Sequence, residues 1–256
     1  MSYRISPATP EGERVIAAAT GLTEAFRSRA DDADRAGEIC ADNYADMWRA
    51  GVASAFVPEE LGGMGLRSML DWTLTIATLA KGDASAAIAI SMHLSATRGL
   101  AGIYRANAPN SAPHMRAKTF LEMVARGEML ICSTTTERGT DNLHPLTEAH
   151  SHADGWRIKG AKNFVTMSPL ATHVATNVRM RDADGDHIAN VLFPMDTPGV
   201  EQQGDWDALG MRASGSQSVK FEDCVVPHTM RSARSGLGAN GARPFWSTAR
   251  WPMCRW

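Results

Sequence analysis

The sequence predicts an α+β protein of two domains, in which an N-terminal all-α helical domain is followed by a middle domain that is an antiparallel β-barrel or sandwich. Up to Gly127, apolar residues recur at the spacing of amphipathic helices. After Gly127, apolar and polar residues alternate in short runs separated by turn residues, as in antiparallel strands. From residue 229 onward neither period persists. We therefore expect domains at residues 1–127 and 128–228 and an irregular tail at residues 229–256.

The first domain is expected to contain five helices, at residues 11–30, 35–50, 68–81, 84–104 and 111–126. Ser68, with Asp71 three residues later, resembles a capping box, and Asp83 is placed to cap the next helix. The helix after Asp83 is small or apolar on all sides over its first three turns, so we expect it to be the buried central helix. Residues 58–65 are too rich in Pro and Gly for either regular state, and they lack the Lys-Ser/Thr ending of a phosphate loop.

The second domain is expected to contain short strands joined by tight turns. The strands lie at residues 129–135, 148–153, 156–158, 163–167, 173–180, 188–193 and 217–221. Asp154-Gly155 is a strong signal for a two-residue hairpin turn, and residues 182–186 indicate a longer one. Gly160 is expected to hinge a further hairpin.

Length and composition are those of an ordinary soluble globular protein. The 256 residues carry 26 Lys and Arg against 28 Asp and Glu, so no global field favours nucleic acid or a membrane surface. The four cysteines are scattered without a Cys-x-x-Cys pair, which argues against a zinc site and fits a reducing compartment. Charged residues precede any apolar run at the N-terminus, and the most apolar window, residues 84–94, is too short to span a bilayer. We expect a cytoplasmic protein that binds neither nucleic acid nor membrane.

Residues 130–166 contain the pattern that points to a ligand. An apolar-then-hydroxyl run over residues 130–136 breaks at a Gly-containing turn, which leaves hydroxyls and backbone amides free at a strand end. Phe164 and Thr166 lie two positions apart, hence on one face of an expected strand. A flat aromatic beside hydroxyl donors suits a flat heteroaromatic ligand such as a flavin. The same residues can be explained without a ligand. The hydroxyls would then solvate a strand end, Phe164 would be a core residue and Thr166 an ordinary strand residue.

Three motifs, in this order along the chain, resemble those of the acyl-CoA dehydrogenase family. They are Val57-Pro58-Glu59-Glu60-Leu61-Gly62-Gly63-Met64-Gly65; Thr136-Glu137, Gly139-Thr140-Asp141 and Gly160-Ala161-Lys162-Asn163-Phe164-Val165-Thr166; and Leu209-Gly210-Met211-Arg212-Ala213-Ser214 with Val219 to Pro227. The resemblance covers roughly residues 11–230. It implies FAD as cofactor, acyl-CoA as substrate, and the homo-oligomers that are common in the family.

The resemblance also implies which residues hold the ligands. The cofactor-binding residues it implies are Ser133, Thr134, Thr135, Thr136, Phe164, Val165 and Thr166. The first four would face the pyrimidine edge of the flavin, while Phe164 would take the family's tryptophan position against the isoalloxazine and Thr166 would lie near N5. Thr140 takes the position of a serine near the phosphates and the acyl-CoA. Arg138 departs from the family by replacing a proline, and the loop is shorter.

The remaining candidates are better explained by structure than by chemistry. His93 lies on a nearly all-apolar helix and is expected to be a core histidine with satisfied hydrogen bonds. His144, His150 and His152 lack the fixed spacing of a metal site, so no metal is expected. Arg212 matches a family position near the domain interface, although a solvated surface arginine accounts for it equally well.

The reaction that the resemblance implies is α,β-dehydrogenation of an acyl-CoA, in which a carboxylate takes the α proton and hydride passes to the flavin. In the family that base lies in a C-terminal helical domain. Residues 229–256 do not resemble that domain, since they hold no Asp or Glu and accumulate Arg and Trp. We therefore expect a truncated or frame-shifted chain and assign no catalytic residue. A reduced-flavin-dependent monooxygenase of the same architecture and an inactive binding fragment remain alternatives.

Overall fold

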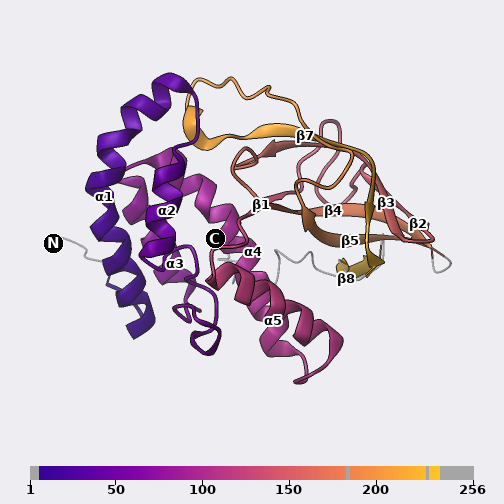
Figure 1. The fold of residues 1–256 in the computed structure, drawn as a ribbon, viewed down its shortest axis with the longest axis horizontal. Coiled ribbons are helices and arrows are strands. Elements are labelled where there is room, and N and C mark those ends of the chain that lie inside the picture. The colour runs from indigo at the N-terminus through magenta and orange to yellow at the C-terminus, as the bar shows by residue number, and fades with distance from the viewer. Residues whose placement is uncertain (1–5, 183–184, 229–230, 237–256) are drawn as a thin grey trace, which may run out of the picture.

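The computed structural model describes residues 6–182, 185–228 and 231–236 of the chain. Helices gather at one end of the molecule and a curled sheet at the other (Figure 1). The helices are α1 (Pro10–Ala36), α2 (Ala41–Arg49), α3 (Met69–Ala80), α4 (Ala84–Ala106) and α5 (Ala112–Ala125), with short 3-10 turns η1 (Glu59–Leu61) and η2 (Arg212–Ser214). The strands are β1 (Ile131–Thr134), β2 (Glu148–His152), β3 (Gly155–Val165), β4 (His173–Asp182), β5 (Gly185–Pro194), β6 (Val200–Gln202), β7 (Gln217–Val226) and β8 (Arg231–Gly236).

The helices begin where their predicted caps are. The Ser68 hydroxyl accepts from Asp71 N, and the Asp83 carboxylate accepts from Ala86 N at 3.1 Å, so both predicted caps are confirmed. The helix that Asp83 caps, α4, is the buried central helix that the sequence predicts. The predicted break between residues 30 and 35 is wrong, because α1 continues to Ala36 and ends at Gly37, whose φ of 68° is left-handed. Ala33 is buried on this extension and continues the apolar stripe.

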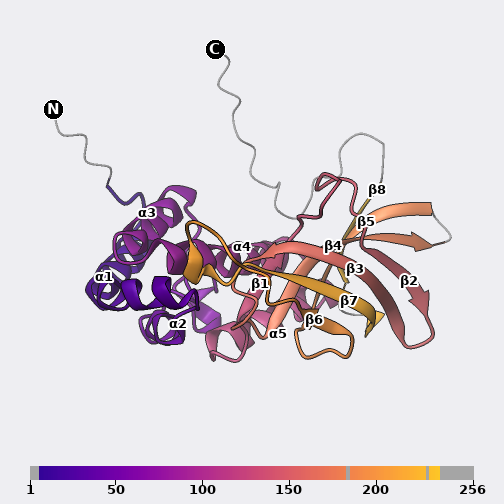
Figure 2. The same cartoon turned by 90° about the horizontal axis from the view of Figure 1, so that it is seen from above.

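The sheet is mixed and open, so the prediction of an antiparallel barrel or sandwich is only partly right. Its order is β6-β7-β3-β2-β4-β5-β8, and β1 pairs with β4 off this path. The sheet curls into a half-barrel whose outer strands, β6 and β8, do not pair with each other in the described part of the chain (Figure 2). β4 runs parallel to both β1 and β2, while the other pairs are antiparallel. Alternation predicted the strands because it reports which face is buried, but it carries no information on the direction of the partner.

β3 is one continuous strand of 11 residues, which corrects the hairpin expected at Gly160. A side chain at Gly160 would place its Cβ 2.6 Å from Thr147 Oγ1, so glycine here lets β3 pass close to the residue before β2 instead of turning. The predicted hairpin at Asp154-Gly155 is confirmed, since it joins β2 to β3 with His152 opposite Gly155.

The expectation that residues from 229 onward are irregular is wrong for residues 231–236. These form β8, which pairs antiparallel with β5. Strand pairing uses backbone groups that every residue except proline carries in full, so an open sheet edge can pair with a segment that shows no apolar alternation. Residues 229–230 and 237–256 lie outside the described part, and with them most of the tail.

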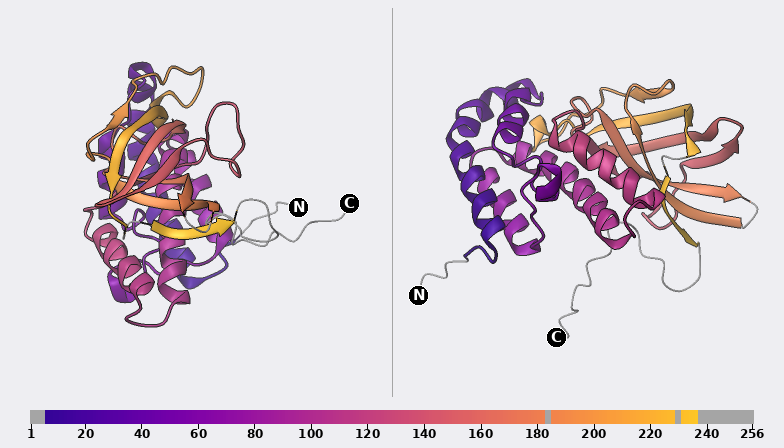
Figure 3. Two further views of the ribbon diagram at one scale, coloured as in Figure 1. Left: turned by 90° about the vertical axis from the view of Figure 1, so that its right-hand side faces the viewer. Right: turned by 60° about the horizontal axis from the view of Figure 1, so that its bottom comes forward.

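One hydrophobic core joins the helices to the sheet. It contains Val57, Ala96 and Leu121 from the helical part together with Ile131 and Leu192 from the strands. Two further cores lie within the helices and within the curled sheet. Views from two further sides show the helices and the sheet lying directly against each other (Figure 3). Among the described residues, no helix offers the length of apolar sequence that crossing a bilayer requires.

His93 sits at the same junction and is the satisfied core histidine that the sequence predicts. Its side chain has no solvent exposure. Nε2 donates to Ala53 O at 2.9 Å, and Nδ1 accepts from Ile131 N at 3.1 Å. The ring therefore ties α4 both to the turn after α2 and to β1. Burial lowers the pKa of His93 to about 4.

Candidate functional site

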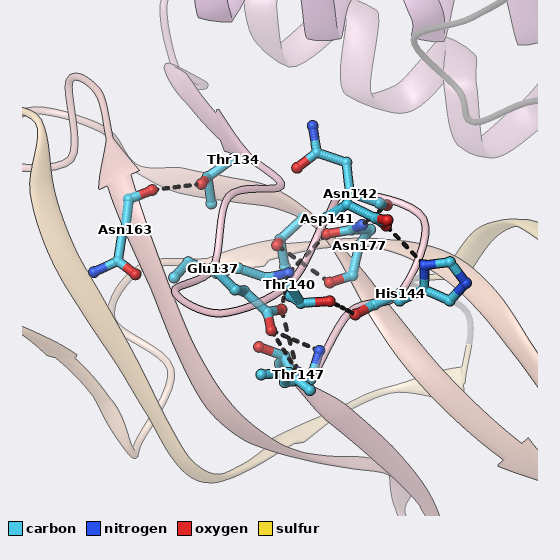
Figure 4. A network of polar contacts seen from close by, with 12 residues as sticks. Thr134, Glu137, Thr140, Asp141, Asn142, His144, Thr147, Asn163 and Asn177 are labelled. Atoms are coloured by element: carbon cyan, nitrogen blue, oxygen red, sulfur yellow. Dashed lines mark hydrogen bonds and ion pairs between the residues drawn. The ribbon is translucent and has the colours of Figure 1, made fainter.

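The structure brings together the two segments that the sequence singled out. The Thr134 hydroxyl donates to Asn163 O at 3.1 Å, and Asn163 N donates to Thr136 O at 2.9 Å. The end of β1 is therefore joined by hydrogen bonds to the end of β3 at Asn163 (Figure 4). β1 pairs with β4, and β3 is joined to the same strand through β2. The curled sheet therefore brings β1 and β3 close together.

Phe164 is turned out of the sheet by its backbone. Its φ of 54° is left-handed, and the β3–β7 register shifts between Lys162 and Val165. Such a bulge re-aims a side chain, and Phe164 is 59% exposed. Trp206 packs edge-on against it, with 6.1 Å between the ring centroids. The result is an exposed aromatic surface at the end of β3.

The argument that Phe164 and Thr166 share one face of a regular strand is wrong, because β3 bulges at Phe164 and ends at Val165. Val165 is fully buried in the core of the sheet. Thr166 is 9% exposed, and its hydroxyl lies 2.9 Å from the Ser216 hydroxyl. Of these three side chains, Phe164 is the one that offers a broad surface to a ligand.

The hydroxyl run at the end of β1 also contains both buried residues and residues that a ligand could reach. Ser133 and Thr134 are buried, and their hydroxyls bond to Met92 O and Asn163 O. Thr135 is half-buried and Thr136 is exposed. Side-chain donors for a ligand in this run therefore come from Thr135 and Thr136, beside backbone groups of the strand end.

A buried ion pair lies directly behind these segments and was not predicted. Lys162 Nζ lies 2.5 Å from Glu137 Oε1 and 2.7 Å from Asn177 Oδ1. Burial lowers the pKa of Lys162 to about 8, against the opposing effect of Glu137. Burial alone would raise the pKa of Glu137, but the Lys162 ammonium and two backbone amides hold it below its ordinary value. Both groups are therefore charged at neutral pH.

Residues 137–147 form a loop whose polar groups bond mainly to one another. The Thr140 hydroxyl donates to His144 O at 2.6 Å, and Asp141 Oδ1 lies 2.8 Å from His144 Nδ1 (Figure 4). Asn142 O accepts from Asn177 Nδ2 at 2.9 Å. The Thr140 hydroxyl therefore donates its hydrogen bond within its own turn. Its assignment to substrate stays a prediction.

A pocket of about 530 Å³ opens between this loop and the strands β3 and β7. Its lining residues are Glu137, Arg138, Leu146, Thr147, Gly160, Ala161, Asn163, Gln203, Asp205, Ser218 and Lys220. Glu137 and Asn163, the direct neighbours of Thr136 and Phe164, line it. The pocket therefore begins at residues next to Thr136 and Phe164 in the chain, while Phe164 and Trp206 themselves are not among its lining residues.

Two residues complete the site and extend the sequence analysis, Trp206 in the loop before η2 and Arg212 at the start of η2. Trp206 Nε1 donates to Met211 O at 3.3 Å and to Arg212 O at 3.1 Å, which fixes the ring beside Phe164. A tryptophan in a polar, Gly-containing loop was the available signal for it. Arg212 Nε donates to Asp34 O at 2.9 Å at the end of α1, so it lies at the interface rather than free on the surface.

Comparison with known proteins assigns the family. Residues 9–106 match the family described as Acyl-CoA dehydrogenase, N-terminal domain, and residues 131–224 match Acyl-CoA dehydrogenase, middle domain. The chain belongs to the acyl-CoA dehydrogenase family. The family is one of flavin-dependent oxidoreductases, so the resemblance drawn from the three motifs is confirmed.

Individual relatives refine this picture. L-evernosamine nitrososynthase from Micromonospora sp. is 34% identical over 236 residues, covering 91% of this chain and 55% of the relative. The structure of KijD3 in complex with FMN and dTDP-3-amino-2,3,6-trideoxy-4-keto-3-methyl-D-glucose superposes with a TM-score of 0.84 at 31% identity, covering 91% of this chain and 56% of that one. Short-chain specific acyl-CoA dehydrogenase from Rattus norvegicus is 29% identical, covering 75% of this chain and 45% of the relative. The chain spans about half the length of the relatives it matches.

The residues at the site fit the flavin that the family implies. An isoalloxazine needs a flat apolar surface and donors for its pyrimidine carbonyls. The exposed ring of Phe164 would supply the first, and the end of β1 at Thr135 and Thr136 would supply the second. Lys162 and Glu137 neutralise each other, so neither of these two buried charges opposes a neutral ring.

Proposed function

We propose that this chain forms the helical and β portions of a flavin-dependent monooxygenase that oxidises the amino group of a nucleotide-linked amino sugar. The observation that carries the proposal is the 34% identity to a nitrososynthase across 91% of the chain, against 29% over 75% for a short-chain acyl-CoA dehydrogenase. The complex of KijD3 with FMN and a dTDP-amino sugar supports the same cofactor and substrate class. We therefore favour FMN over the FAD expected from the sequence.

In this proposal the chain's own residues bind and orient the flavin. The Phe164 ring, held by Trp206, would lie against the isoalloxazine and exclude water from it. Thr135, Thr136 and the adjoining backbone hold the pyrimidine edge. A bound reduced flavin supplies the electrons with which molecular oxygen is activated. The substrate amine must be unprotonated to be oxidised.

Glu137 does not serve as the acid or base of this reaction. Its side chain is 3% exposed, and its carboxylate is held ionised by Lys162 and by the amides of Leu146 and Thr147. Proton transfer to or from substrate therefore falls to a group other than this carboxylate, and we assign no catalytic residue.

The proposal is tested by giving the purified 256-residue chain two substrates under two conditions. With FMN, a flavin reductase, NADH and air, a dTDP-amino sugar is expected to gain oxygen at nitrogen, which mass spectrometry detects. Without air, butyryl-CoA is expected to leave oxidised flavin unbleached. Bleaching by the acyl-CoA without oxidation of the amino sugar would refute the proposal in favour of dehydrogenation. A chain that binds flavin but oxidises neither substrate would instead support the binding-fragment alternative.

A further inference from the structure

Lys162 and Glu137 join the two segments from which the proposed flavin site is built. Lys162 directly precedes Asn163, and Glu137 directly follows Thr136. Their side chains are 0% and 3% exposed, and their charged atoms lie 2.5 Å apart. Burying two charges is costly, and an apolar pair of similar volume often stabilises a fold equally well. Stability alone therefore gives no reason for this pair.

The other contacts of the pair lead into the 137–147 loop. Glu137 Oε2 accepts from Leu146 N at 2.6 Å and from Thr147 N at 3.2 Å, where the loop returns to the sheet. Asn177 on β4 accepts from Lys162 Nζ and donates to Asn142 O, near the middle of the loop. One buried ammonium group therefore connects β3 and β4 to the start, the middle and the end of the loop.

We propose that Lys162 is a positioning residue of the flavin site, which fixes the Thr136 main chain and the 137–147 loop against β3 through Glu137 and Asn177 and so sets flavin affinity. The inference rests on the proposed function, because it takes the groups at Thr136 and Phe164 as the flavin contacts. Lys162 has no exposed surface with which to touch a ligand, so it acts through its partners. Replacing Lys162 should therefore shift the flavin contacts at Thr136 and Phe164 without removing either of them.

Two variants separate positioning from the mere avoidance of an unpaired charge. Lys162→Met leaves Glu137 buried and unpaired, so it is expected to lose both thermal stability and flavin affinity. The double variant Lys162→Met/Glu137→Gln removes both charges but keeps a carbonyl acceptor for the amides of Leu146 and Thr147. It is expected to regain most of the melting temperature while its Kd for FMN stays raised by roughly tenfold or more.

FMN binding is measured by quenching of flavin fluorescence, and the position of the loop by amide hydrogen exchange over residues 136–147. Exchange there is expected to be faster in both variants, with the β4–β5 amides unchanged. As a control, Arg29→Met breaks an ion pair to Asp46 in the helical part at 2.7 Å, and it should lower stability but leave the Kd within about twofold of wild type.

Two results would overturn the positioning role of Lys162. These are a double variant that binds FMN as tightly as wild type, and exchange over residues 136–147 that is unchanged in Lys162→Met. A wild-type chain that binds no flavin would count against the proposed function instead, and the exchange comparison would still decide whether Lys162 holds the loop.

Discussion

Lowering the pH from about 7.5 to about 5 is expected to weaken the joint between the helices and β1 through a single residue, His93. Ala53 O can only accept, so Nε2 must carry the proton; Ile131 N–H can only donate, so Nδ1 must be bare. These contacts fix one neutral tautomer. A proton added at Nδ1 would face the Ile131 N–H and break the bond to β1.

The magnitude follows from the pKa. Burial lowers the pKa of His93 from its ordinary value of 6.5 to about 4. Between these two pH values His93 is protonated in the unfolded chain but neutral in the folded chain, so the free energy of unfolding falls as the pH falls. The contribution of His93 to the free energy of unfolding is fully present above about pH 7. It is smaller by about 2 kcal/mol at pH 5, and the loss levels off at about 3 kcal/mol below pH 4.

The assay is urea unfolding of wild type and of His93→Gln at pH 7.5 and pH 5. Glutamine offers a donor and an acceptor but does not titrate, so the carboxylates contribute equally to both proteins and cancel in the difference. Wild type is expected to lose about 2 kcal/mol more than the variant. An NMR titration of His93 in wild type checks the same quantity without a variant. Equal losses in the two proteins, or a His93 midpoint near 6.5, would refute the reasoning.

Four further substitutions, of which Gly21→Ala is the control for Gly160→Ala, test other contacts. Trp206→Ala should raise the Kd for FMN by roughly 3- to 10-fold in a fluorescence titration, because Phe164 loses its edge-on partner; an unchanged Kd would show that the contact is irrelevant. Gly160→Ala should cost about 1–3 kcal/mol in urea unfolding, whereas Gly21→Ala in α1, where a Cβ meets nothing within 4 Å, should stabilise by up to about 1 kcal/mol. Asp71→Ala should cost about 1–3 kcal/mol by removing a buried acceptor of two hydrogen bonds at 2.7 Å, and a change below about 0.5 kcal/mol would contradict this.

The sequence predicted best what depends on neighbouring residues. Ser68 and Asp83 cap their helices because a short polar side chain reaches an amide three residues on, and Asp154-Gly155 turns because its own backbone allows it. His93 was predicted to be buried because its helix is apolar on all sides. The break predicted between residues 30 and 35 was wrong because nothing local stops α1 before Gly37.

The rest depends on partners far along the chain. The parallel pairing of β1 with β4 leaves no mark in either strand, since alternation reports only which face is buried. The left-handed backbone at Phe164 is uncommon for a bulky residue and is imposed by the β3–β7 bulge. Lysine is rarely buried, so the burial of Lys162 became predictable only once Glu137, 25 residues earlier, was placed beside it.

The pairing of β1 with β4 also sets an order in time. Ile131 finds its strand partner at His173, 42 residues later, and Trp156 on β3 pairs with Val226, 70 residues later. During synthesis β1 therefore emerges long before its partner, while α1 to α5 can fold from local contacts as they appear. The finished helices offer β1 its first binding surface, through the shared core and the His93 bond to Ile131. Until β4 arrives, β1 has an unpaired edge, and an unpaired strand edge exposes the nascent chain to aggregation.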